Sequence, residues 1–382
     1  MGKRKVLGLI YGYNEAWIGG SYYIENLISC LFTLPSSDQP QIRVYVFNES
    51  SHKAILAKDF ADLIDIVFIE SDRSIIDRIL NRLNYLITGR YLLSPGFDSD
   101  VDVIFPNPSS FHFYKMKTSV FWVPDFQEKY FPEFFSEFEI ERRRKEHLRF
   151  AQNETILVLS SQSALNDYKK FYPENNSKNY VIPFAVSIPS IEGIDTSSIL
   201  HKYGLSSPFL ICCNQFWAHK GHKILLRAIA DIKAKGLSIK VVFTGKTVDD
   251  RNPLFFKELS DLAEELGLAD SIIFLGFIPR TDQLILMKEA MAIIQPSQFE
   301  GWSTVVEDAK VLNKCIVVSN LEVHKEQLPE DYDGFFNTNS VESLSHKIEE
   351  ALEGRVSKLD VNYSELQIDF GKRIMDMIYD VS

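Results

Sequence analysis

The sequence is poor in cysteine and has no residue spacing typical of a metal cluster. Four cysteines occur among 382 residues, at Cys30, Cys212, Cys213 and Cys315, each in or beside an apolar run. No C-x-x-C pair and no Cys/His spacing of a zinc site is found. We therefore predict reduced, buried thiols, as is usual for a cytoplasmic protein, and no bound metal.

Long apolar stretches and an excess of basic residues are also missing. No run reaches the length of a membrane span, and the apolar segment 6–10 is too short for a signal peptide. The net charge is −11, which argues against general binding to nucleic acid. Hydrophobic residues make up 45% and charged residues 24%, a typical globular balance. The sequence thus predicts a soluble cytoplasmic protein.

Short apolar runs alternate with helical patterns along the chain, which is typical of βαβ units and parallel sheets. The predicted strands are 6–10, 42–47, 64–69, 102–105, 118–123, 155–160, 179–182, 209–213, 240–243, 272–275, 292–295 and 315–319. The predicted helices are 22–31, 75–87, 137–151, 163–171, one containing Leu225, Ile229 and Ile232, 255–266, 281–289, 341–352 and 364–379.

This pattern predicts an α/β fold with two Rossmann-like domains. The stretch 183–193 has no clear period and carries two prolines and a glycine, so a linker is predicted there. The expected division is a first domain at 1–185, a linker at 186–204, a second domain at 205–362 and a final helix at 363–382. Ligands of such sheets bind beyond the carboxyl ends of the strands, so a cleft between facing domains is expected to hold the ligand.

The segment 295–310 combines a strand end, a loop and a helix start in the sequence QPSQFEGWSTVVEDAK. Thr304 and Glu307 fit a capping box. Backbone N–H groups at 301–306 would then form an anion site with the helix dipole. Carboxylates at Glu300 and Asp308 can accept hydrogen bonds from sugar and ribose hydroxyls. The alternative is that these acids only cap the helix, which suits Glu307 best.

The run FEGWSTVVEDA resembles the E-G-F-G-x-x-x-x-E-A signature of retaining glycosyltransferases with the GT-B fold, specifically family 4. The resemblance implies that Glu300 contacts the donor sugar. It also implies that Asp308, eight residues later, contacts the ribose with an arm one methylene shorter than the usual Glu. Gly301 would let the backbone approach the donor, and Trp302, Ser303 and Thr304 replace the usual residues, as in bacterial surface-polysaccharide enzymes.

The segment NQFWAHKGH, residues 214–222, resembles the R-x-x-x-x-K-G motif of the same family. Lys220 matches the residue that neutralises the donor diphosphate, whereas Gln215 stands in the slot of the Arg. A lone lysine can bind phosphate as a point charge, so leaving-group stabilisation is expected to need His219 or His222. The alternative is a solvated lysine at a helix start.

Further donor contacts follow from the resemblance alone. Gly20 belongs to a Gly-Gly pair that resembles the loop near the donor, although a turn explains it equally well. The expected remaining positions are Gly245 at a strand end beside the nucleotide, and Gly276 and Phe277 at the nucleobase.

The stretch FWVPDF resembles the acceptor-side loop in which relatives carry His-Asp. Pro124 occupies the His slot, and Asp125 is the candidate that orients or deprotonates the acceptor hydroxyl. The alternative is that Asp125 caps the following turn. The resemblance implies that the last helix crosses back onto the first domain.

These features predict transfer of a hexose (mannose, glucose, rhamnose or similar) from a UDP- or GDP-linked sugar to a glycan or lipid-linked acceptor in cell-surface polysaccharide biosynthesis, with no cofactor. Three alternatives stay open. One is a non-catalytic partner of a glycosylation complex, favoured by Gln215 and Pro124. Another is a metal-dependent GT-A transferase using Asp98-Ser99-Asp100 or Asp100-Val101-Asp102. The third is a nucleotide-sugar epimerase.

Weak peripheral contact with the inner face of a membrane is a further expectation. Basic residues in an Ile/Leu-rich helical stretch and a basic run at 142–145 could touch anionic lipid, although a solvated basic face explains them as well. The residues of the first group are Arg73, Arg78, Arg82 and Arg90.

Overall fold

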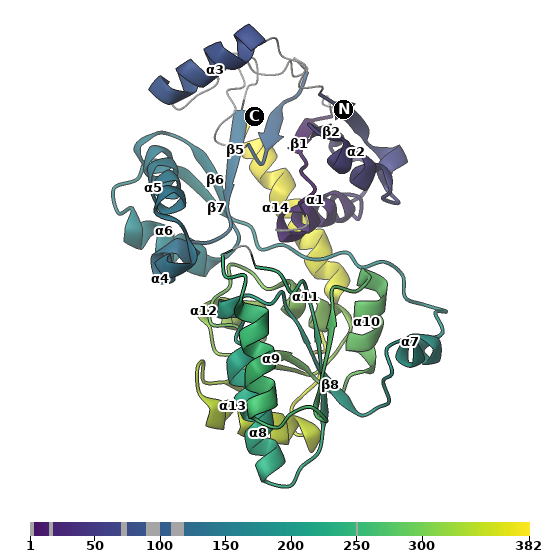
Figure 1. Ribbon diagram of the computed structural model, residues 1–382. Coiled ribbons are helices and arrows are strands. Elements are labelled where there is room, and N and C mark those ends of the chain that lie inside the picture. Colours follow the sequence, from purple (N-terminus) through teal and green to yellow (C-terminus); the bar gives the residue numbers. More distant parts are fainter. Residues whose placement is uncertain (1–3, 15–17, 70–74, 89–99, 108–117, 250) are drawn as a thin grey trace. The chain divides into compact units, whose positions relative to one another are not determined.

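The computed structural model describes residues 4–14, 18–69, 75–88, 100–107, 118–249 and 251–382 (Figure 1). Two compact units are present. Unit 1 consists of Met1–Phe126, Ser136–Ser187 and Ser364–Ser382, and unit 2 consists of Gln127–Phe135 and Ile188–Tyr363. No helix in these described ranges is both long and apolar enough to cross a membrane.

Unit 1 contains a parallel sheet with the strand order β3-β2-β1-β4-β5-β6-β7. Most of these strands are buried apolar runs, as in β1, where Leu7 and Leu9 are fully buried, whereas the edge strands β3 and β7 are only partly buried. The strands are β1 (Val6–Ile10), β2 (Gln41–Val46), β3 (Asp65–Phe68), β4 (Val103–Phe105), β5 (Thr118–Val123), β6 (Ile156–Leu159) and β7 (Lys178–Val181).

The helices of unit 1 include the predicted ones and one that the periodicity does not predict. Helix α2 (Glu49–Leu56) is short and polar, and the side chain of Asn48 caps it by accepting from the Ser51 N–H. The other helices are α1 (Ile18–Leu31), α3 (Ile75–Thr88), α5 (Glu137–Gln152), α6 (Gln162–Phe171) and the last helix, α14 (Tyr363–Val381).

Helix α14 lies in unit 1 from Ser364 onward, which confirms the predicted return of the C-terminal helix to the first domain. It packs beside α1, where Gly371 comes close to the carbonyl of Cys30 (Figure 1). Gln367 Nε2 donates to the Val186 carbonyl at 2.9 Å, and Thr118 Oγ1 donates to the Val381 carbonyl at 2.8 Å. These contacts hold α14 against the segment after β7 and against the start of β5.

Unit 2 contains a second parallel sheet with the order β10-β9-β8-β11-β12-β13. Figure 1 shows α8 and α9 on one side of β8 and α10 on the other. The strands are β8 (Phe209–Cys213), β9 (Lys240–Thr244), β10 (Ile272–Gly276), β11 (Ile293–Gln295), β12 (Ile316–Ser319) and β13 (Phe335–Phe336). The helices are α7 (Thr196–Lys202), α8 (His222–Ala234), α9 (Phe255–Glu265), α10 (Arg280–Glu289), α11 (Thr304–Val311), α12 (Glu322–Gln327) and α13 (Val341–Leu352), with the short α4 (Gln127–Tyr130) and η3 (Pro132–Phe134).

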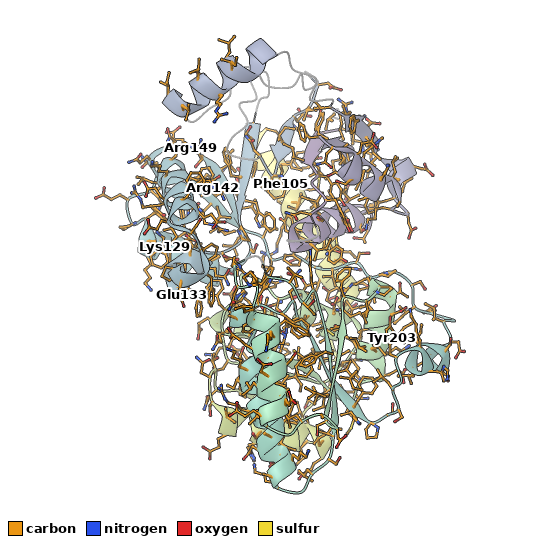
Figure 2. All side chains as sticks on the ribbon, viewed as in Figure 1. Phe105, Lys129, Glu133, Arg142, Arg149 and Tyr203 are labelled. Atoms are coloured by element: carbon orange, nitrogen blue, oxygen red, sulfur yellow. The ribbon has the colours of Figure 1, made fainter. Side chains whose placement is uncertain are left out.

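Helix α7 lies within the stretch 186–204 that was predicted as a linker. Asp195 caps its start, and at its end Lys202 Nζ and the Tyr203 hydroxyl both donate to Asp282 on α10 at 2.6 Å (Figure 2). These polar contacts, which periodicity does not reveal, fix α7 against α10.

The strand order of unit 2 has a topological switch point. The chain passes from β8 to β9 to β10 in one direction, and then returns to place β11 on the opposite side of β8. Open parallel sheets bind ligands outside the carboxyl ends of the strands at such a reversal. The loops that follow β8 and β11 are therefore where a ligand is expected.

Candidate functional site

The loops after β8 and β11 are held together by close backbone contacts. Gly221 has φ +74°, and a Cβ there would overlap the carbonyl of Pro296. The N–H of Gln298 donates to the His219 carbonyl at 2.7 Å. Gly245, with φ +148°, comes equally close to the Asn214 carbonyl. Glycine is needed at both positions. A side chain at 221 would separate the loops after β8 and β11, and a side chain at 245 would separate the loops after β8 and β9.

Lys220 and Glu300 meet at the switch point. Lys220 Nζ lies 2.7 Å from Glu300 Oε1, and their side chains are 15% and 8% exposed. Gln295 Nε2 donates to the same oxygen at 2.9 Å. The structure thus brings together the two residues that the sequence motifs assigned to the diphosphate and to the sugar, although 80 residues separate them.

The start of α11 differs from the predicted capping box. Ser303 is the cap, because its Oγ accepts from the Val306 N–H, and Thr304 is the first helical residue. Glu307 lies too far into the helix to return to the cap, so the prediction of a Thr304/Glu307 box is wrong. Gly301 and Trp302 lie in the loop just before the cap, and the ring of Trp302 faces Lys310 Nζ at 5.9 Å.

The backbone anion site at the start of α11 is partly occupied by the protein itself. The Ser303 N–H donates to Gln327 Oε1 at 3.0 Å, and the Val306 N–H bonds the Ser303 side chain. Fewer N–H groups are therefore available to an anion than the range 301–306 suggested. Binding of an anion at this position therefore depends more on positive side chains at the strand ends.

Asp308 forms a bidentate ion pair with Arg280, a residue that the sequence motifs did not identify. Arg280 Nη1 lies 2.7 Å from Asp308 Oδ2, and Nη2 bonds the other carboxylate oxygen. Asp308 is fully buried, whereas the Arg280 side chain is 22% exposed. Arg280 begins α10, shortly after Gly276 (φ +69°) and Phe277, which is 65% exposed. The carboxylate is thus held at the base of the site by a guanidinium.

His219 and His222 do not supply positive charge beside Lys220. Burial lowers the pKa of His219 well below its usual value. Burial, together with the nearby Lys220 ammonium, lowers the pKa of His222 to about 3. Burial therefore favours the neutral form of both rings, so a contribution of His219 or His222 to leaving-group stabilisation would have to come from a hydrogen bond and not from a positive charge. Gln215, in the slot of the missing Arg, follows β8 and is partly buried.

The segment Gln127–Phe135 belongs to unit 2 and packs aromatic rings on both loops. Tyr130 and Phe131 lie 5.5 and 6.2 Å from the ring of Phe299, and Phe134 lies 6.0 Å from His219. Figure 2 marks this segment by Lys129 and Glu133. The residues on either side of the segment, including the acceptor-side candidate Asp125, belong to unit 1.

The remaining predicted site residues and the metal alternative lie in unit 1. Gly20 is in the first turn of α1, which begins at Ile18. Asp100 pairs with Arg43 at 2.8 Å, and Asp102 Oδ2 accepts from the Val6 N–H at 2.9 Å, so both are used structurally. Asp98 and Ser99 lie outside the described residues. Within the described ranges no group of three metal-ligating side chains occurs.

Comparison with known proteins identifies the fold. Residues 201–368 match the model of the family described as glycosyl transferases group 1, which covers most of unit 2. None of the curated protein sequences matches the chain. The GT-A alternative is wrong, because two parallel sheets of this kind form the GT-B fold.

Solved structures resemble the chain over its whole length. A glycosyltransferase from Rickettsia africae ESF-5 has a TM-score of 0.67 at 14% identity, covering 99% of each chain. Anabaena Alr3699/HepE, solved with UDP and glucose, has a TM-score of 0.63 at 16% identity, covering 99% of this chain and 97% of that one. WaaG, a glycosyltransferase involved in lipopolysaccharide biosynthesis, has a TM-score of 0.56 at 14% identity, covering 98% and 95%. The chain has the GT-B fold, and the match of residues 201–368 to glycosyl transferases group 1 supports glycosyl transfer.

Proposed function

We propose that the protein is a retaining glycosyltransferase that moves a hexose from a nucleoside diphosphate sugar to a glycan or lipid-linked acceptor. The observation that carries this proposal is the Lys220–Glu300 pair at the switch point of the second sheet. The ammonium suits a diphosphate, and the carboxylate suits sugar hydroxyls. The solved complex of HepE with UDP and glucose supports a UDP-linked sugar, and the role of WaaG supports a surface polysaccharide.

Each residue has a distinct role in this proposal. Lys220 and the start of α11 hold the diphosphate, Glu300 aligns the sugar, and the Arg280–Asp308 pair lies toward the ribose. The bond between the anomeric carbon and the phosphate oxygen breaks, and a bond to the acceptor oxygen forms on the same face. The acceptor proton passes to the leaving phosphate or to Asp125. Catalysis then rests on positioning and on stabilising the leaving group, without a metal.

Glu300→Gln tests the proposal, because it keeps the shape of the side chain and removes its charge. We expect the rate of sugar transfer to fall about 100-fold, while UDP or GDP alone still binds. The measurement is nucleotide release with a panel of UDP- and GDP-linked glucose, mannose and rhamnose, with Glu322→Gln on α12 as the control. Full transfer by Glu300→Gln would exclude this assignment, and a wild type that neither transfers nor hydrolyses any donor would favour the non-catalytic alternative.

Peripheral contact with an anionic membrane is the second part of the proposal. Helix α3 exposes a row of large apolar side chains, and α5 carries Arg142 and Arg149 seven residues apart (Figure 2). An amphipathic helix with an exposed apolar face suits a lipid surface, and basic residues suit anionic lipid. Arg73 and Arg90 lie outside the described residues, and Arg82 is exposed. The apolar row of α3 consists of Ile79, Leu80, Leu83, Leu86 and Ile87.

Sedimentation with vesicles tests the membrane contact. The wild type should sediment with vesicles rich in anionic lipid at low salt, and Leu83→Ser/Leu86→Ser should weaken this binding several-fold because apolar area is lost. Leu63→Ser, which alters an exposed leucine outside α3, is the control. If the wild type stays in the supernatant under these conditions, the contact does not exist.

A further inference from the structure

A buried amide lies directly beneath the Lys220–Glu300 pair. Gln295 is the last residue of β11, follows two apolar residues of that strand, and is fully buried. An amide at such a position is costly unless its polar atoms are bonded. None of the family motifs assigned a role to it, so the polar residue at this strand end needs another explanation.

The neighbours of Gln295 fix the orientation of its amide. Its Oε1 accepts from Asn214 Nδ2 at 2.7 Å, and Asn214 is itself 5% exposed. Because the oxygen is turned toward Asn214, the NH2 group faces the loop that carries Glu300. There Nε2 lies 2.9 Å from Glu300 Oε1 and 3.1 Å from the hydroxyl oxygens of Ser297 and Ser303.

Among the three acceptors of Gln295 Nε2, the Glu300 carboxylate forms the strongest hydrogen bond. An amide NH2 has two protons, and a hydrogen bond to a carboxylate is stronger than one to a hydroxyl. Glu300 Oε1 therefore has two donors, Gln295 and Lys220. A diphosphate that attracts Lys220 would weaken the second contact, whereas the buried amide would stay in place because its own partners are part of the fold.

We propose that Gln295 is the positioning residue of Glu300, holding Oε1 so that Oε2 is presented to the hydroxyls of the donor sugar. The inference rests on the proposed function, since it concerns the same sugar contact. It predicts that Gln295 affects recognition of the sugar and not of the nucleotide. It also predicts that sugar recognition depends on a proton that residue 295 donates to the Glu300 carboxylate.

Gln295→Met is the first variant, because it has a similar volume and no donor. We expect its Kd for the nucleotide sugar bound by the wild type to rise about 10-fold or more, the effect of one hydrogen bond to a charged group. Its Kd for the matching nucleoside diphosphate should stay unchanged. Both are measured by calorimetry, using UDP-glucose and UDP or the GDP pair, after a thermal melt has shown a folded protein.

Gln295→Glu is the second variant and provides a pH readout. It keeps the acceptor for Asn214 but places a second carboxylate against Glu300, and two such groups share a proton. Its transfer rate relative to the wild type should therefore recover as the pH falls from 8 to 6. Gln298→Glu, whose side chain bonds Asn339 instead, is the matched control and should follow the wild type at every pH.

The outcomes separate the two proposals. If the wild type binds none of the nucleotide sugars, the proposed function fails. If the wild type binds one and Glu300→Gln impairs transfer, the site stands. In that case, wild-type sugar affinity in Gln295→Met would overturn the positioning role. A Gln295→Glu variant with a wild-type pH profile would also overturn it.

Discussion

Replacing Glu307 by alanine should lower the free energy of unfolding by about 3–5 kcal/mol, the cost of removing one partner of a buried ion pair. Glu307 is 1% exposed, and its Oε1 lies 2.8 Å from Lys310 Nζ and 2.8 Å from Gln327 Nε2. Its Oε2 accepts from the Tyr363 hydroxyl at 2.7 Å. The alanine variant would leave an ammonium whose side chain is 7% exposed without its carboxylate. It would also remove one acceptor each from Gln327 Nε2 and the Tyr363 hydroxyl.

A second ion pair in the same unit provides the control. Glu322 and Lys325 have the same i,i+3 spacing and the same 2.8 Å separation as Glu307 and Lys310, but their side chains are 75% and 49% exposed. Glu322→Ala should therefore cost less than about 1 kcal/mol. Thermal melts of both variants measure the difference, and similar small shifts in the two melting temperatures would contradict the prediction.

A double replacement tests the cause of the Glu307 effect. Glu307→Leu/Lys310→Met removes both charges and keeps the volume, and such replacements of buried pairs are often close to neutral. Its melting temperature should lie well above that of Glu307→Ala. Equal losses in the two variants would show that the contacts to Gln327 and Tyr363, and not the uncompensated charge, determine stability here.

The fold could be predicted from the sequence because most of its strands are buried apolar runs. The predicted and observed bounds of β1, β5 and β8 are identical, and those of the other predicted strands differ by one or two residues. The helices that were missed are short and polar. Asn48 and Asp195 cap two of them through side-chain hydrogen bonds, and such local polar contacts leave no apolar period in the sequence.

The site was predictable only in part. Lys220 and Glu300 were found because motifs place them after strand ends, and parallel topology brings such ends together. The partners of the acids were not found, because Arg280 is 28 residues from Asp308 and Gln327 is 20 from Glu307. Pairings over such distances are set by the packing of helices, which a one-dimensional pattern does not contain.

Lys220→Met should reduce kcat for sugar transfer by about 100- to 1,000-fold, the range for losing one preorganised group that stabilises developing charge. Gln215 is uncharged, and the buried His219 and His222 are neutral, so these neighbours cannot replace the ammonium. Lys220→Arg should retain part of the rate, because charge is kept while the geometry of a point charge is lost.

Lys223→Met is the matched control for this effect. Lys223 lies three residues further along, on α8, where it pairs with Glu258 at 2.6 Å and its side chain is 41% exposed. Transfer rates of this variant should equal those of the wild type. A Lys220→Met enzyme that keeps more than about a tenth of the wild-type kcat would contradict the assignment, since so small a loss is about what one ordinary hydrogen bond contributes.

The double variant Lys220→Met/Glu300→Gln shows whether the two residues act as a unit. In the proposal Lys220 holds the diphosphate, and the buried amide of Gln295 keeps Glu300 in place when the diphosphate attracts Lys220. The two single losses in kcat should therefore multiply in the double variant. A combined loss close to the larger single loss would contradict this. It would mean that the two residues act as a unit, with Lys220 needed to align Glu300 through their contact at Oε1.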